Sequence, residues 1–160
     1  MQESTSPKTV LLVDDNPGDV FLLRRALARC GIADRIQVAR DGEEAFAYLC
    51  GLDEFEDRAK FPMPWILITD LKMPQVGGLE LLQHLRNLPE CRDLPVFILS
   101  SSTLEKDVSE ASRLGANGFF LKPVRIEELE DIIKGIYERA DMVRRSFSSH
   151  VEPRTETVSI

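Results

Sequence analysis

Residues 10–15 read VLLVDD, four apolar residues followed at once by Asp14 and Asp15. An apolar run without polar alternation is typical of a strand that is covered on both faces, as in a parallel sheet. Four further short runs follow along the chain, and the second run is the least apolar of them. These runs predict strands over residues 36–39, 65–69, 96–99 and 119–121.

Segments with helical periodicity separate the predicted strands. The first helix is expected to begin at Asn16-Pro17 and to end at Gly31, because proline suits a first helical turn and glycine a C-terminal cap. The others are expected over 41–50, 78–88, 104–115 (carrying the apolar residues Leu104, Val108, Ala111 and Leu114) and from 126 to at least 143. Strand and helix alternate five times, which predicts an α/β fold with a doubly wound, five-stranded parallel sheet and five helices.

The length of 160 residues suggests one domain. We expect a flexible N-terminus over 1–7, the domain over 8–146, and a polar, disordered tail over 147–160. The connection 51–64, before the third strand, is acidic and long enough to be an insertion. It is read either as a partner-recognising segment or as a mere surface loop.

Charge and composition narrow the class of protein. The net charge is −7, and an acidic surface repels phosphate backbones, so direct binding of nucleic acid is not expected. Three widely spaced cysteines without a CxxC pair favour free thiols in a reducing compartment. No signal-peptide pattern and no apolar run of membrane-spanning length is found, so we expect a cytoplasmic protein without a membrane partner.

Polar residues follow four of the five predicted strands. In an open α/β sheet the carboxyl ends of the strands meet at one edge, where ligands bind. The residues expected there are Asp14, Asp15, Asp70, Ser100 and Lys122.

This set of side chains indicates phosphoryl chemistry. Three clustered carboxylates repel one another, and a hard divalent cation such as Mg²⁺ would relieve that repulsion. A metal, a lysine and a hydroxyl together suit a phosphoryl group, and a carboxylate can serve as its acceptor. Asp70 is the best candidate acceptor, because it stands alone at a strand end while Asp14 and Asp15 remain to hold metal.

Four short segments carry a family resemblance. They are LLVDDN at 11–16, ITDLKMP at 68–74 with Gly77-Gly78, LSS at 99–101, and FLKP at 120–123. In this order and spacing they resemble the receiver domains of two-component response regulators, over roughly residues 8–140. The resemblance implies a flavodoxin-like receiver fold. It also implies that Asp70 accepts a phosphoryl group from a sensor histidine kinase.

The same resemblance implies roles for the neighbouring residues. Asp15, Asp70 and the backbone carbonyl of Lys72 would ligate Mg²⁺ directly, and Asp14 through water. Ser100 and Lys122 would contact the phosphoryl group.

Two conformational features are also implied. Ser100 and Phe119 would form the switch pair, and Lys122-Pro123 would be a cis peptide.

A narrower resemblance is to small stand-alone regulators that partner cyanobacterial and bacterial phytochromes. It rests on residues 16–19, 41–45 and the long link before the third strand. It implies a phytochrome-type kinase as partner and a homodimer through the long fifth helix. Because one helix and a short tail follow Lys122, output is expected through protein contacts.

We expect a signalling protein and not an enzyme, with two alternatives. One is a receiver scaffold that works without phosphorylation. The other is a Mg²⁺-dependent aspartyl phosphatase, disfavoured because Lys72 stands where such enzymes carry an acid. A flavin or nucleotide binder is disfavoured because no GxGxxG or GxxxxGK[ST] motif occurs.

Overall fold

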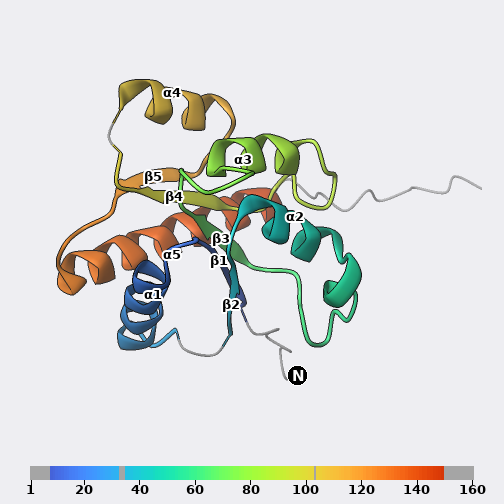
Figure 1. Ribbon diagram of the computed structural model, residues 1–160, viewed down its shortest axis with the longest axis horizontal. Coiled ribbons are helices and arrows are strands. Elements are labelled where there is room, and N and C mark those ends of the chain that lie inside the picture. The colour runs from blue at the N-terminus through green and yellow to red at the C-terminus, as the bar shows by residue number, and fades with distance from the viewer. Residues whose placement is uncertain (1–7, 33–34, 103, 150–160) are drawn as a thin grey trace, which may run out of the picture.

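The computed structural model describes residues 8–32, 35–102 and 104–149. Its elements follow the predicted alternation (Figure 1). They are β1 Val10–Val13, α1 Pro17–Arg29, β2 Ile36–Ala39, α2 Gly42–Cys50, the short 3₁₀ helix η1 Asp53–Phe55, β3 Ile66–Thr69, α3 Gly78–Arg86, β4 Val96–Ser100, α4 Glu105–Arg113, β5 Gly118–Leu121 and α5 Ile126–Ser149.

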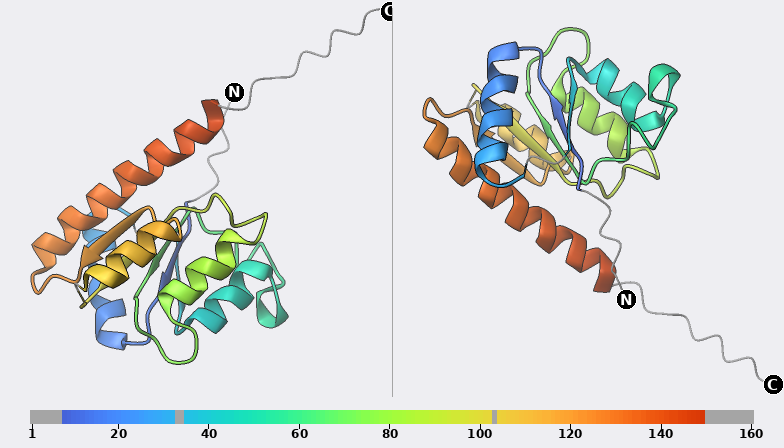
Figure 2. Two further views of the ribbon diagram at one scale, coloured as in Figure 1. Left: turned by 90° about the horizontal axis from the view of Figure 1, so that it is seen from above. Right: turned by 90° about the horizontal axis from the view of Figure 1, so that it is seen from below.

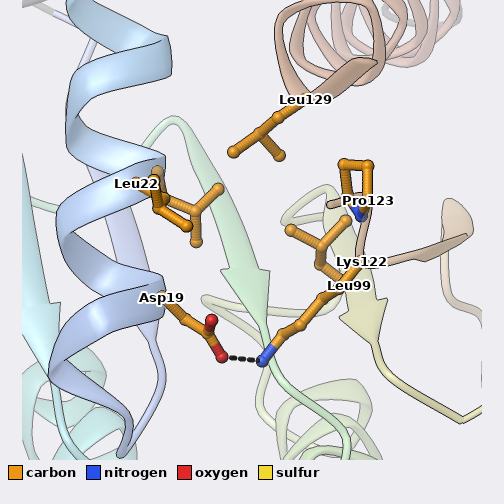
Figure 3. Close-up of a pocket in the computed structure, with 7 residues that line it drawn as sticks. Asp19, Leu22, Leu99, Lys122, Pro123 and Leu129 are labelled. Atoms are coloured by element: carbon orange, nitrogen blue, oxygen red, sulfur yellow. Dashed lines mark hydrogen bonds and ion pairs between the residues drawn. The ribbon is translucent and has the colours of Figure 1, made fainter. Parts of the chain in front are cut away.

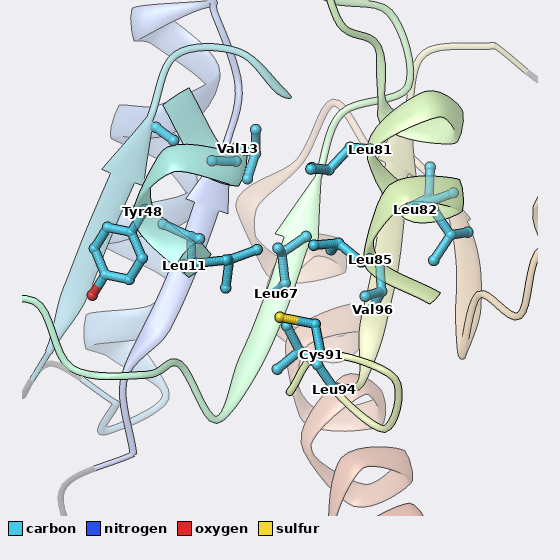
Figure 4. Packing of buried hydrophobic residues seen from close by; sticks show 14 of the residues in the cluster. Leu11, Val13, Tyr48, Leu67, Leu81, Leu82, Leu85, Cys91, Leu94 and Val96 are labelled. Carbon is cyan, nitrogen blue, oxygen red and sulfur yellow. The ribbon is translucent and has the colours of Figure 1, made fainter. Parts of the chain in front are cut away.

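All five strands are parallel and lie in the order β2-β1-β3-β4-β5, which confirms the predicted fold class. Helices α1 and α5 cover one face of the sheet, and α2, α3 and α4 cover the other (Figures 1 and 2). Each face has its own apolar cluster, and Figure 4 shows the one beneath α2 and α3. The register pairs Val13 with Thr69, so the residues that follow β1 and β3 leave the sheet side by side.

Position in the sheet explains the strand sequences. The central strands β1, β3 and β4 are buried along their whole length, and all three were expected from uninterrupted apolar runs. The edge strands β2 and β5 are only partly buried. This is why the run at 36–39 tolerates a polar Gln37.

The ends of α1 are as predicted. The side chain of Asn16 caps its N-terminus, Pro17 opens it, and Gly31 follows it with φ of 77°.

The apolar residues of the fourth predicted helix are only partly covered. Ala111 is buried and Leu114 partly buried, but Leu104 is 51% exposed and Val108 40% exposed. Leu104 precedes α4 as its cap residue and does not lie within the helix. The helix itself sits over the edge strand β5, so the sheet beneath it can cover only a narrow stripe (Figure 1).

Helix α5 runs to Ser149, beyond residue 146, where we placed the end of the domain. Its second half is anchored at the amino end of β3: Arg144 donates to the carbonyl of Trp65, and the Trp65 ring lies 5.4 Å from that of Tyr137. The predicted flexible N-terminus at 1–7 and the tail from 150 onward lie outside the described residues.

The expected cis peptide at Lys122-Pro123 is wrong, because no peptide bond in the described ranges is cis. The trans form is the commoner one for bonds to proline. The backbone N–H of Lys122 still bonds to the carbonyl of Ser100, at 2.7 Å, and so continues the ladder between β4 and β5.

The connection 51–64 packs against α2. The rings of Tyr48, Phe55 and Phe61 contact one another, with centroids 5.0 to 5.9 Å apart. The guanidinium of Arg58 donates to the carbonyls of Tyr48 and Leu49 at 2.7 and 2.8 Å, so it satisfies the last turn of α2. The segment is therefore packed against the domain and hydrogen-bonded to it.

Candidate functional site

Asp14 follows β1 and is almost completely buried, with 3% of its surface exposed. Its backbone N–H donates to the carbonyl of Ala39, and its Oδ1 accepts from the backbone N–H of Asn16 at 2.9 Å. Burial raises the pKa of Asp14, against the opposing effects of the Asn16 N–H and of Lys122. A buried carboxylate held in this way favours a cation beside it.

Asp70 follows β3 and is fixed from several sides. Its backbone N–H donates to the carbonyl of Val13 at 2.8 Å, and its Oδ1 accepts from the N–H of Leu71 at 2.7 Å. At the start of α3, Gly78 leaves room for the Asp70 carbonyl, since a Cβ at that position would lie 2.3 Å from the carbonyl oxygen. Only glycine allows this close approach.

Lys122 joins these carboxylates from the end of β5. Its Nζ donates to Oδ2 of Asp14 and of Asp70, both at 3.0 Å, and to Oδ2 of Asp19 at 2.7 Å. Burial alone would lower the pKa of Lys122, but the hydrogen bonds that it donates to Asp19, Asp14 and Asp70 outweigh burial and raise its pKa. The lysine is therefore a permanent positive charge at the candidate acceptor.

The carboxylates of Asp14, Asp15 and Asp70 form a donor set for a metal. Each offers one oxygen, and the three oxygens lie within 4.8 Å of one another. Asp15 is exposed, so water can complete a coordination shell. Few carboxylates together with water suit Mg²⁺, so the residues present fit the predicted ion.

Three other predicted residues are Ser100, Phe119 and Lys72. Ser100 ends β4 and is buried, and its Oγ accepts from the N–H of Ser102 at 3.0 Å. Phe119 lies in β5, half-buried against the cluster beneath α2 and α3. Lys72 is exposed, two residues after Asp70.

The structure adds one residue that the sequence did not single out. Asp19, in the first turn of α1, makes the shortest of the three bonds to Lys122 (Figure 3). An acid in a first helical turn would have been read only as a partner of the helix dipole.

Comparison with known proteins agrees with this geometry. The sequence pattern described as the response regulator receiver domain matches residues 10–134. The chain belongs to this family of two-component signalling domains.

Two similar regulatory proteins are matched over most of their length. The chain is 31% identical to the response regulator Rcp1 of a Synechocystis strain, over 84% of this chain and 89% of Rcp1. It is 34% identical to the probable methanogenesis regulatory protein FilR2 of Methanothrix harundinacea, over 85% of each.

Solved structures show the same relationship. The Mn²⁺-bound form of Rcp1 has a TM-score of 0.72 over 81% of this chain and 91% of that one, at 31% identity. The phosphorylated cyanobacterial phytochrome response regulator RcpA has a TM-score of 0.75 over 83% of this chain and 93% of that one, at 32% identity.

The part of the chain described here contains no helix with the length and apolar character needed to cross a bilayer.

Proposed function

We propose that this chain is a single-domain response regulator that accepts a phosphoryl group on Asp70 from a histidine kinase, in a Mg²⁺-dependent reaction. The observation that carries the proposal is the position of Lys122, whose Nζ lies 3.0 Å from Oδ2 of Asp70 beside two further carboxylates. A nucleophilic carboxylate, a fixed ammonium and a cation site at one point suit phosphoryl transfer.

The transfer itself needs little covalent chemistry from the protein. A carboxylate oxygen of Asp70 forms a bond to phosphorus while the bond from phosphorus to the kinase histidine breaks. The electron pair of that bond stays on the imidazole nitrogen, which then takes a proton from water. Bound Mg²⁺ would supply positive charge to the phosphoryl oxygens during the transfer.

Residues of the chain are proposed to bind the metal and to stabilise the phosphoryl oxygens. Asp14, Asp15, Asp70 and the backbone carbonyl of Lys72 are the proposed metal-binding groups. Lys122 stabilises charge that develops on the phosphoryl oxygens, and the hydroxyl of Ser100 donates to one of them.

Output follows from a local rearrangement in this proposal. When Ser100 turns toward the phosphoryl group, Phe119 enters the space that it leaves, and the surface around α4 and β5 changes. Exposed apolar side chains on that side support protein contacts as the output. They belong to Leu104, Val108, Leu121 and Val124.

Partners are inferred from chemistry and from the relatives. The similarity to the cyanobacterial phytochrome response regulator RcpA favours a phytochrome-type histidine kinase as phosphoryl donor. A homodimer through the long α5 is proposed, and direct binding of nucleic acid is not, because the net charge is −7. Three free cysteines suit a reducing compartment, which supports the cytoplasm as location.

Two alternatives remain distinct from this proposal. A phosphorylation-independent scaffold would need none of the charges around Asp70, so their assembly disfavours it. A Mg²⁺-dependent phosphatase would need an acid two residues after its nucleophile, where this chain has the exposed Lys72. The chain is proposed to signal and not to turn over a substrate.

The test is intact mass after incubation with a small acyl phosphate, with Mg²⁺ and with chelator. Wild type should gain one phosphoryl group only with Mg²⁺, Asp70→Asn should gain none, and the control Glu56→Gln should behave as wild type. Absence of an adduct in wild type under every condition would overturn the proposal in favour of the scaffold.

A further inference from the structure

Asp19 occupies an unusual place beside Lys122. Its Oδ2 lies 2.7 Å from Nζ, against 3.0 Å for both Asp14 and Asp70. The backbone of Asp19 is also fixed, because its N–H donates to the capping side chain of Asn16 at 3.1 Å. Figure 3 shows the carboxylate reaching from α1 to the ammonium across the gap between α1 and the end of β5.

The hydrogen bonds of Lys122 are fully used in this arrangement. An ammonium has three N–H groups, and three carboxylates accept from it. Two of these, Asp14 and Asp70, also belong to the candidate metal cluster, and Asp19 does not. Among the partners of Lys122 in the described chain, Asp19 is thus the one that metal binding would leave in place.

Metal binding would disturb the other two partners. Oδ1 of Asp14 already accepts from Asn16 and Oδ1 of Asp70 from Leu71, while both Oδ2 atoms accept from Lys122. A cation must therefore share or displace these hydrogen bonds. Without a third partner, a half-buried ammonium would compete with the cation for the same two carboxylates.

The surroundings strengthen the bond between Asp19 and Lys122. The pair lies over a small cavity of about 20 Å³ whose other lining is apolar. That lining consists of Leu22, Leu23, Leu99, Pro123 and Leu129. Apolar side chains reduce screening by water, so one carboxylate here holds the ammonium more firmly than it would on an open surface.

We propose that Asp19 is a positioning residue that holds Lys122 at the acceptor while Asp14 and Asp70 turn to the metal. By holding the lysine, Asp19 lets the cation bind without leaving a charge unpaired. The expected effect of Asp19 on the rate of phosphoryl transfer rests on the proposed function. The expected effect of Asp19 on Mg²⁺ affinity holds whether or not Asp70 accepts a phosphoryl group.

The first test is calorimetric titration of the full chain with Mg²⁺. Asp19→Asn should bind Mg²⁺ roughly tenfold more weakly, the size typical when a partner that orients a metal site is lost. The conservative Asp19→Glu should restore most of the affinity. Glu43→Gln is the matched control, since Glu43 is also an acid in a first helical turn at this edge of the sheet, and it should stay close to wild type.

A double-mutant cycle separates positioning from simple charge. In a Lys122→Met background, Asp19→Asn should have much less effect on Mg²⁺ affinity than in wild type, because the lysine through which Asp19 acts is gone. Equal effects in both backgrounds, or an Asp19→Asn variant that binds Mg²⁺ as tightly as wild type, would overturn the inference.

The second test is the rate of adduct formation on Asp70 at saturating Mg²⁺, measured against acyl-phosphate concentration. Asp19→Asn should lower the maximal rate several-fold, and Asp19→Glu should recover part of it. An unchanged maximal rate would remove the role in transfer. If wild type itself gains no phosphoryl group, the proposed function fails, while the Mg²⁺ titration and the cycle still decide the role of Asp19.

Discussion

Replacing Asp15 by asparagine should stabilise the protein when no metal is present. Asp15 has one carboxylate oxygen within 4.8 Å of those of Asp14 and Asp70. The ion pairs of Lys122 in the described chain go to Asp14, Asp19 and Asp70, so none of them compensates Asp15 directly. Asparagine keeps the shape of the side chain and removes only the charge.

The magnitude follows from the separation. Two unit charges no more than 4.8 Å apart repel by at least about 0.9 kcal/mol in a medium as polar as water. Asp15 takes part in two such pairs, and the nearby Lys122 offsets part of the sum. The free energy of unfolding should therefore rise by about 1 kcal/mol, which raises the melting temperature by roughly 2–4 °C in a protein of this size.

The assay is urea unfolding followed by circular dichroism, in chelator and in millimolar Mg²⁺. Mass action should stabilise wild type in Mg²⁺ and stabilise Asp15→Asn much less, so the difference seen in chelator shrinks or reverses. Glu56→Gln, which removes an exposed charge away from the site, is the control. If Asp15→Asn were less stable than wild type in chelator, or gained as much from Mg²⁺, the reasoning would be wrong.

Two further predictions concern the 51–64 connection. Arg58→Ala should lower the free energy of unfolding by about 2–3 kcal/mol and speed amide exchange in this segment, because carbonyls of α2 lose a charged donor. A decrease in the free energy of unfolding that is too small to measure would contradict this prediction. Burial raises the pKa of Tyr48 from 10.0 to about 12, so the folded state keeps the proton longer and stability should fall as pH rises through that interval. Tyr48→Phe should flatten this part of the pH profile and cost about 1 kcal/mol at neutral pH, since the bond to the Pro62 carbonyl is lost; an unchanged profile would count against it.

The central strands were predictable because burial on both faces requires an apolar residue at nearly every position, which gives an uninterrupted apolar run in the sequence. Val10 to Val13 and Ile66 to Thr69 have no face open to solvent, so nearly every position is apolar. The fourth helix was less predictable, since Leu104 and Val108 fit a helical stripe by spacing alone. Whether a stripe is covered depends on what lies beneath it, and α4 has only an edge strand there.

The residues of the candidate site were also predictable only in part. Asp14, Asp70 and Lys122 could be placed together because each follows a strand, and parallel strand ends share one edge. Asp19 could not, because it lies on a helix and meets Lys122 103 positions further along the chain. That contact depends on how α1 packs on the sheet, and the packing angle of a helix cannot be read from the spacing of residues in the sequence.

The charges at this edge of the sheet serve binding at the expense of folding. Asp14, Asp19 and Asp70 share one ammonium and Asp15 lies beside two of them, so the site carries excess negative charge in the absence of a cation. The same excess favours a divalent cation at this point and would make its removal costly, which would couple metal occupancy to stability. Asp19 differs from the other three carboxylates, because it pairs with Lys122 and is not one of the proposed metal ligands. A site in which every carboxylate served the metal would leave Lys122 to compete with the cation, and Asp19 removes that conflict.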